Sequence, residues 1–150
     1  MIPTKFLHPV GLFEEVSHGQ LSKISEISEM VEQSRGELIF TEGDRAEYLY
    51  ILVEGKVAIR VKLTSRPESI TVAVLNQSYQ SFGWSGVVEP YHYTASALCE
   101  TDCYLIAIPG ERFIEILRQE PVSGFEVMRR ISEVVSSRLR NSRAALLKTL

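Results

Sequence analysis

The stretch from residue 82 to residue 97 holds the side chains whose types and spacing best suit ligand binding. Gly83-Trp84-Ser85-Gly86, followed by Val87-Val88, predicts one turn of helix opened by a glycine. The start of a helix exposes unpaired backbone N–H groups and the positive end of the helix dipole, which suits an anion such as a phosphate. Thr94 and Ser96 would add hydroxyl donors on the strand that follows. A compact surface loop without a ligand would have the same pattern, so both interpretations stay open.

The sequence around this stretch predicts short β-strands separated by turns. Residues 57–63 alternate apolar and polar side chains, the pattern of a half-buried strand. The predicted strands are residues 38–41, 48–53, 57–63, 70–75, 94–99 and 104–108. Many short strands with regular turns and no helices between them predict an antiparallel sandwich, barrel or jelly roll.

Helical spacing of apolar residues marks the two ends of the chain. It predicts helices over residues 20–33, 110–118 and 122–147. We therefore expect a single domain over residues 1–150, with a helical segment 1–35, a β region 36–108 and C-terminal helices 110–147. The apolar stripe of the last helix is Phe125, Met128, Ile131, Val135 and Leu139. That stripe could pack on the domain's own sheet or on the same helix of a second copy, and spacing alone does not separate the two.

Two segments of the chain resemble a known family. Residues 36–44 (GELIFTEGD) and 49–57 (LYILVEGKV) are similar to the opening of the cyclic-nucleotide-binding domain of Crp/Fnr transcription regulators, cyclic-nucleotide-dependent kinases and gated channels. Gly43 and Gly55 fall at turns where a left-handed backbone is expected. The resemblance implies a mainly β fold with flanking helices: a double-stranded β-helix (jelly roll) of cyclic-nucleotide-binding type, with an N-terminal helix and a long C-terminal helix. It also implies a regulatory domain that forms a homodimer through the last helix.

Within that family, residues 82–97 correspond to the phosphate-binding cassette, and we use that name for them below. The family pattern is Phe-Gly-Glu, a small helix, then Arg-Thr/Ser-Ala, in which the Glu holds the ribose and the Arg pairs with the cyclic phosphate. This chain matches the opening Phe-Gly and the closing Thr-Ala, but Trp84 stands at the Glu position and Tyr93 at the Arg position. A charge-assisted hydrogen bond contributes roughly 1.5–3 kcal/mol. Losing two such bonds would weaken the binding of cyclic AMP or cyclic GMP by about two to four orders of magnitude.

We therefore expect a small-molecule-sensing regulatory domain whose ligand is a small anionic or aromatic compound, a cyclic nucleotide being one candidate. The expected ligand-binding residues are Phe82, Gly83, Trp84, Ser85, Gly86, Val87, Tyr93, Thr94 and Ala95. Two alternatives stay open. Trp84 and Tyr93 could simply fill the pocket, leaving a ligand-free dimeric interaction scaffold, or the chain could be the effector domain of a transcription regulator.

The remaining chemistry-bearing residues do not predict catalysis. The three histidines, His8, His18 and His92, are too scattered for the metal site of a cupin enzyme. Cys99 and Cys103 are too few for an iron–sulfur cluster and are expected to be reduced, half-buried thiols. The carboxylates are spread over helix and turn surfaces. We expect no enzyme activity, no metal and no cofactor.

Charge and hydropathy bear on partners. Residues 1–128 carry 10 basic and 18 acidic side chains, a net charge of −8, which would repel a nucleic-acid backbone. In Crp/Fnr regulators a helix-turn-helix follows the long helix, whereas this sequence stops at Leu150, so we expect no direct DNA binding by this chain. No apolar run is long enough for a membrane helix and no signal peptide precedes the domain, which predicts a cytoplasmic protein.

Overall fold

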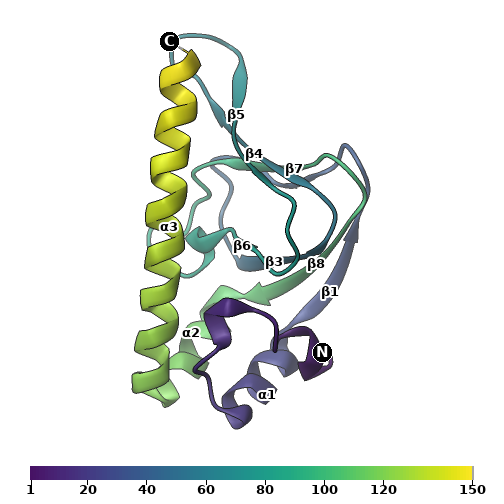
Figure 1. Ribbon diagram of the computed structural model, residues 1–150, viewed down its shortest axis with the longest axis vertical. Coiled ribbons are helices and arrows are strands. Elements are labelled where there is room, and N and C mark those ends of the chain that lie inside the picture. The colour runs from purple at the N-terminus through teal and green to yellow at the C-terminus, as the bar shows by residue number, and fades with distance from the viewer. Residues whose placement is uncertain (150) are drawn as a thin grey trace.

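Two antiparallel four-stranded sheets enclose the core in the computed structural model, which describes residues 1–149 (Figure 1). The first sheet contains, in spatial order, β1 (Glu29–Gln33), β8 (Cys103–Pro109), β3 (Tyr48–Glu54) and β6 (Ser81–Phe82). The second contains β2 (Leu38–Phe40), β7 (Ser96–Cys99), β4 (Val57–Lys62) and β5 (Ser69–Leu75). Consecutive strands change sheet repeatedly, as in a jelly roll, and the expected mainly β architecture is confirmed.

The inward-facing side chains of the two sheets meet in one apolar cluster. Leu52 and Leu105 from the first sheet and Val57 and Leu75 from the second are buried to within 2% exposure. The turn before β4 is tight, since Gly55 has φ +116° and a Cβ there would lie 2.6 Å from the carbonyl oxygen of Asp102. The alternating pattern of the sequence thus places these strands correctly because each buries one face.

The predicted helix over residues 20–33 is wrong in its second half. Helix α1 spans His18–Ile27, and its first turn is capped by Ser17, whose hydroxyl accepts a 3.1 Å hydrogen bond from the amide of Gln20. Residues 29–33 instead form β1, paired antiparallel with β8. A five-residue run fits either period, and the ladder to a strand far along the chain decides it. The β region therefore begins at residue 29 rather than 36.

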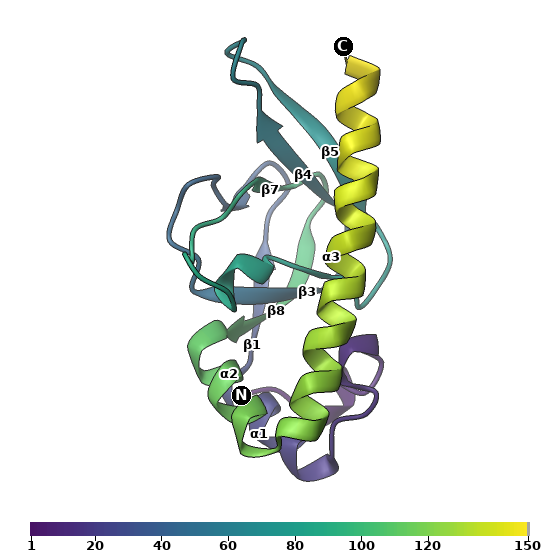
Figure 2. The same cartoon turned by 90° about the vertical axis from the view of Figure 1, so that its left-hand side faces the viewer.

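Three helices and two short 3₁₀ turns cover one end and one side of the roll. The 3₁₀ turns η1 (Thr4–Phe6) and η2 (Gly11–Phe13), together with α1 and α2 (Gly110–Gln119), lie at one end of the sheets. Helix α3 (Pro121–Thr149) starts at that end and runs along the roll past β5 (Figure 2).

A buried glutamine ties the helices together. The side chain of Gln20 donates a 2.9 Å hydrogen bond to the carbonyl of Ile116 on α2 and accepts a 2.7 Å bond from the hydroxyl of Ser123 on α3. Gln20 is 1% exposed, so both bonds form away from water and are costly to break. The base of α3 is thereby held to the rest of the domain.

Several smaller features bear on function. Cys99 and Cys103 are free thiols and are buried more completely than the half-buried state expected for them. Burial raises the pKa of the Cys99 thiol to about 12. None of the helices in the described chain is long and apolar enough to cross a membrane. In residues 1–149, no three His, Cys, Asp or Glu side chains gather closely enough to hold a metal ion.

Candidate functional site

The cassette begins where β6 ends inside the roll. Phe82 is 1% exposed in the core, and the next residue, Gly83, takes a left-handed conformation with φ +78°. A Cβ on Gly83 would approach the ring of Tyr50 to 3.2 Å, so glycine serves both the backbone angle and the close packing. The 3₁₀ turn η3 (Trp84–Gly86) follows, which is the single helical turn expected from the sequence.

Two glycines allow η3 to pack directly against strand β3 and helix α2. A Cβ on Gly110, the first residue of α2, would lie 1.8 Å from the carbonyl oxygen of Gly86. A Cβ on Gly86 would lie 2.7 Å from the carbonyl oxygen of Tyr48. No larger residue fits either position without a backbone shift. The place of the cassette is therefore tied to the place of α2.

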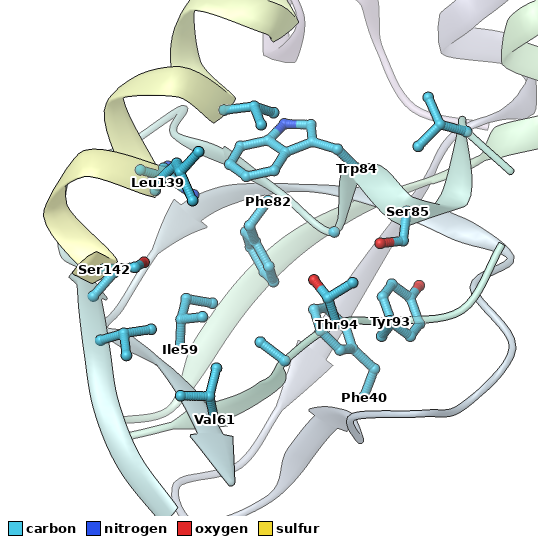
Figure 3. A pocket seen from close by; sticks show the side chains of 17 residues that line it. Phe40, Ile59, Val61, Phe82, Trp84, Ser85, Tyr93, Thr94, Leu139 and Ser142 are labelled. Carbon is cyan, nitrogen blue, oxygen red and sulfur yellow. The ribbon is translucent and has the colours of Figure 1, made fainter. Parts of the chain in front are cut away.

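A cavity of about 390 Å³ lies between the cassette, the hairpin of β4 and β5, and helix α3 (Figure 3). Its cassette-side lining includes seven of the nine expected ligand-binding residues: Phe82, Gly83, Trp84, Ser85, Tyr93, Thr94 and Ala95. The opposite wall comes from the sheet and from α3: Ile59, Val61, Val72, Ala73, Val135, Arg138, Leu139 and Ser142. Most of this surface is apolar.

The other two expected residues do not line this cavity. Gly86 borders a second hollow of about 580 Å³ beside α2, and Val87 is 5% exposed in the core beneath the helices. The reason is the tightness of the 3₁₀ turn, which sends successive residues to different sides. The amides of Gly86 and Val87 also bond the carbonyls of Gly83 and Trp84, so these two amides are already used within the turn.

Tyr93 is built into the floor of the cavity. Its ring stacks on Phe40 with a centroid distance of 3.8 Å, and it is 6% exposed. Its hydroxyl donates a 2.8 Å hydrogen bond to the carbonyl of Tyr48. Burial raises the pKa of Tyr93 above its ordinary value and that of neighbouring Tyr50 to about 12. The hydroxyl of Tyr93, which stands at the Arg position of the family pattern, is therefore bonded within the domain.

Trp84 reaches from the cassette toward α3 (Figure 3). Its indole Nε1 donates a 3.1 Å hydrogen bond to the hydroxyl of Ser81, which fixes the ring. The guanidinium of Arg138 on α3 lies over the face of the indole, 4.7 Å from the ring centroid. This cation–π contact joins the cassette to the long helix.

Arg138 is the site residue that the sequence analysis missed. Burial lowers its pKa to about 10, and in the described part of the chain it forms no ion pair with a carboxylate. The helical spacing could have found it, since it continues the three- and four-residue steps of the buried Val127, Ile131 and half-buried Val134.

Comparison with known sequences agrees with this geometry. Residues 30–120 match the family model described as "Cyclic nucleotide-binding domain". A CRP-like cAMP-activated global transcriptional regulator of Mycobacterium tuberculosis is 23% identical over 92% of this chain and 59% of its own length. A cAMP-dependent protein kinase regulatory subunit of Mycosarcoma maydis is 43% identical over 37% of this chain and 11% of its own length. The chain thus spans less than two thirds of these curated relatives.

Solved structures share the fold. A Geobacter metallireducens protein named for cyclic nucleotide binding superposes with a TM-score of 0.79 and 29% identity, over 93% of this chain and 99% of that one. The sensor domain of the transcriptional regulator DNR from Pseudomonas aeruginosa gives a TM-score of 0.76 and 20% identity, over 91% of each chain. The latter likeness concerns the fold alone.

Proposed function

This chain belongs to the cyclic nucleotide-binding domain family, and we propose that it senses a small molecule held in the cavity between the cassette and α3. Its relatives are regulators and their sensor domains, and it is a regulatory domain of the same type. The observation that carries the proposal is the position of the cavity. Because one wall is the cassette and the other is α3, a bound ligand touches both.

The two residue exchanges in the cassette argue against a cyclic nucleotide as the preferred ligand. Trp84 replaces the carboxylate that would accept the ribose hydroxyl, and its own N–H is bonded to Ser81. Tyr93 replaces the guanidinium, and its hydroxyl is bonded to the backbone of Tyr48. We therefore keep the expectation that cyclic AMP and cyclic GMP bind weakly.

Signal transmission would use the contacts that leave the cavity. Trp84 meets Arg138 of α3, and Gly86 meets Gly110 of α2. A ligand that binds two packings of these elements with different affinity shifts the population between them. Occupancy of the cavity would in this way change the surface that α3 presents.

Helix α3 supports a homodimer as part of the same proposal. Phe125 is 65% exposed, Val135 39% and Leu139 66%, although all three are large and apolar. Val135 and Leu139 also line the cavity, so the same helix from a second copy would cover the cavity mouth.

We further propose a cytoplasmic binding protein without enzyme activity or cofactor, supported by the scattered carboxylates and by the regulatory roles of the relatives.

The alternative is a ligand-free scaffold, which the Phe40–Tyr93 stack favours because these two rings of the cavity lining already pack on each other without a ligand. A titration separates the two. Cyclic AMP, cyclic GMP and aromatic acids are added while Trp84 fluorescence and the melting temperature are followed. A ligand at 100 times its Kd would stabilise the fold by about 2.7 kcal/mol. No change with any compound up to millimolar concentrations would favour the scaffold.

A further inference from the structure

We propose that the ligand is an organic anion with a flat apolar body, and that its charge is bound by Arg138 of α3 instead of by the cassette. The inference rests on the proposed sensor function and names the class of compound that the same cavity would take. It moves the charged anchor from the cassette to the long helix.

The first argument is the unpaired state of Arg138. Two of the other arginines of α3 have carboxylate partners: Arg129 contacts Glu126 at 2.8 Å, and Arg130 contacts Glu14 at 3.1 Å. The remaining two, Arg140 and Arg143, are exposed to solvent. Arg138 lines an apolar cavity and, among the described residues, meets no carboxylate. Its lowered pKa of about 10 still leaves it charged at neutral pH. A half-buried cation without a counter-ion is unfavourable, and a ligand anion would supply the missing partner.

The second argument is the character of the cavity wall. Figure 3 shows Phe82, Ile59 and Val61 facing the space beneath Trp84. Aromatic rings gain most from such surroundings when they pack offset-stacked or edge to face on other rings. A flat apolar body therefore fits the wall, and Arg138 at one side fits a single negative group.

The third argument concerns what the cavity lacks for a nucleotide. The described lining residues include no aspartate or glutamate, so a ribose hydroxyl would find no charged acceptor. The indole N–H of Trp84 and the hydroxyl of Tyr93 are bonded to Ser81 and Tyr48, so the other polar side chains of the lining are Arg138 and the hydroxyl-bearing Ser85, Thr94 and Ser142. A buried polar group left without its partner weakens binding strongly, so a ligand with few polar groups is favoured.

The test compares aromatic acids with their uncharged amides by calorimetry and by the emission of Trp84, the only tryptophan. The probes are benzoate, 2-naphthoate and indole-3-acetate, each with its primary amide, and cyclic AMP as reference. We expect at least one acid to bind at least about tenfold more tightly than its amide. Arg138→Met should remove that preference. Arg140→Met, which removes the same charge from an exposed neighbour on α3, should keep it.

Each other outcome overturns one part of the proposal: the role of Arg138, the class of ligand or the sensor function. Equal binding of acid and amide, or a preference that survives in Arg138→Met, overturns the role of Arg138 and leaves the sensor function standing. Cyclic AMP binding at least about tenfold more tightly than every acid overturns the ligand class. No binding of any compound at millimolar concentrations overturns both the inference and the sensor function. If Arg138→Met does not fold, Arg138→Gln serves in its place with the same expected loss.

Discussion

At the residue scale, the departures from the family pattern have become structural parts of the domain. The hydroxyl of Tyr93 donates a hydrogen bond to the Tyr48 carbonyl, and its ring stacks on Phe40. The indole N–H of Trp84 donates a hydrogen bond to Ser81, and the face of its ring contacts the guanidinium of Arg138. Neither side chain keeps a free polar group for a phosphate or a ribose. The charge that remains at the cavity sits on the helix.

Removing the Tyr93 hydroxyl should destabilise the domain. Tyr93→Phe leaves the partly buried carbonyl of Tyr48 without this donor, and we expect the free energy of unfolding to fall by about 1–2 kcal/mol in urea titrations. Tyr104→Phe is the control, since Tyr104 is 42% exposed and surface exchanges usually stay within about 0.5 kcal/mol. Equal stability of Tyr93→Phe and the wild type would show that the bond contributes nothing.

The raised pKa of Tyr50 predicts a loss of stability at high pH. Burial keeps this phenol neutral in the folded state up to about pH 12, whereas the unfolded chain releases the proton near the ordinary value of 10.0. The contribution of Tyr50 to the free energy of unfolding is therefore complete below pH 10 and is lost as the pH rises toward 12. Urea midpoints measured from about pH 9 to about pH 11.5 should fall less in Tyr50→Phe than in the wild type. Parallel pH profiles of the two proteins would contradict this.

At the element scale, the cassette is positioned by what touches it from both sides. The glycine pair Gly86 and Gly110 lets η3 and the start of α2 approach backbone to backbone. Helix α3 meets the cassette through Arg138 and is itself held at its base by Ser123 and Gln20. A movement of any one of these elements therefore requires a change in the contacts of the others.

A methyl group at the glycine contact should displace the cassette. In Gly110→Ala the Cβ would overlap the carbonyl oxygen of Gly86, so η3 or α2 must shift. Overpacking of this kind destabilises by about 1–3 kcal/mol. We expect that loss in thermal unfolding, together with a shifted Trp84 emission maximum.

The matched control is Gly19→Ala inside α1. A Cβ at Gly19 meets nothing within 4 Å, and alanine is the better helix former, so stability should stay equal or rise by up to about 1 kcal/mol. If Gly110→Ala behaves like Gly19→Ala, the close approach of η3 and α2 does not position the cassette.

At the scale of the whole molecule, α3 takes part in both the domain and the proposed dimer. One face of the helix buries Val127 and Ile131 against the domain. A neighbouring face leaves Phe125 and Leu139 exposed. The stripe expected from the sequence contains residues of both faces: Ile131 packs on the domain itself, whereas pairing of the exposed residues with a second copy stays a prediction. The exposed part is the surface that a second copy would bury.

The dimer prediction is tested by mass in solution. At tens of micromolar, light scattering should give twice the 16.9 kDa of one chain for the wild type. Leu139→Glu should give a monomer, because a charge placed at the centre of an apolar interface must be desolvated. Arg140→Ala, at an exposed neighbouring position, should remain dimeric. A monomeric wild type would remove the pairing of α3 from the proposal.

The sequence alone determined what depends on local pattern. Short β-rich runs between turns located β2 to β5, β7 and β8 but missed the two-residue β6. Three- and four-residue spacing located α2 and α3, and the Gly-Trp-Ser-Gly run located the cassette turn. Each of these signals comes from neighbours along the chain, which share one element and one face. A mainly β domain with a long last helix follows from them, and the resemblance to the cyclic-nucleotide-binding domain specified the jelly roll.

Only the tertiary structure decided what depends on partners far apart in the chain. Residues 29–33 became a strand because β8 lies beside them, although their own pattern also allowed a helix. The hydroxyl of Tyr93 is hydrogen-bonded to the carbonyl of Tyr48, and the guanidinium of Arg138 lies on the ring of Trp84. No local spacing encodes either contact. A hydrogen bond or a cation–π contact depends on the distance between two groups in space, and folding sets that distance for residues remote in sequence.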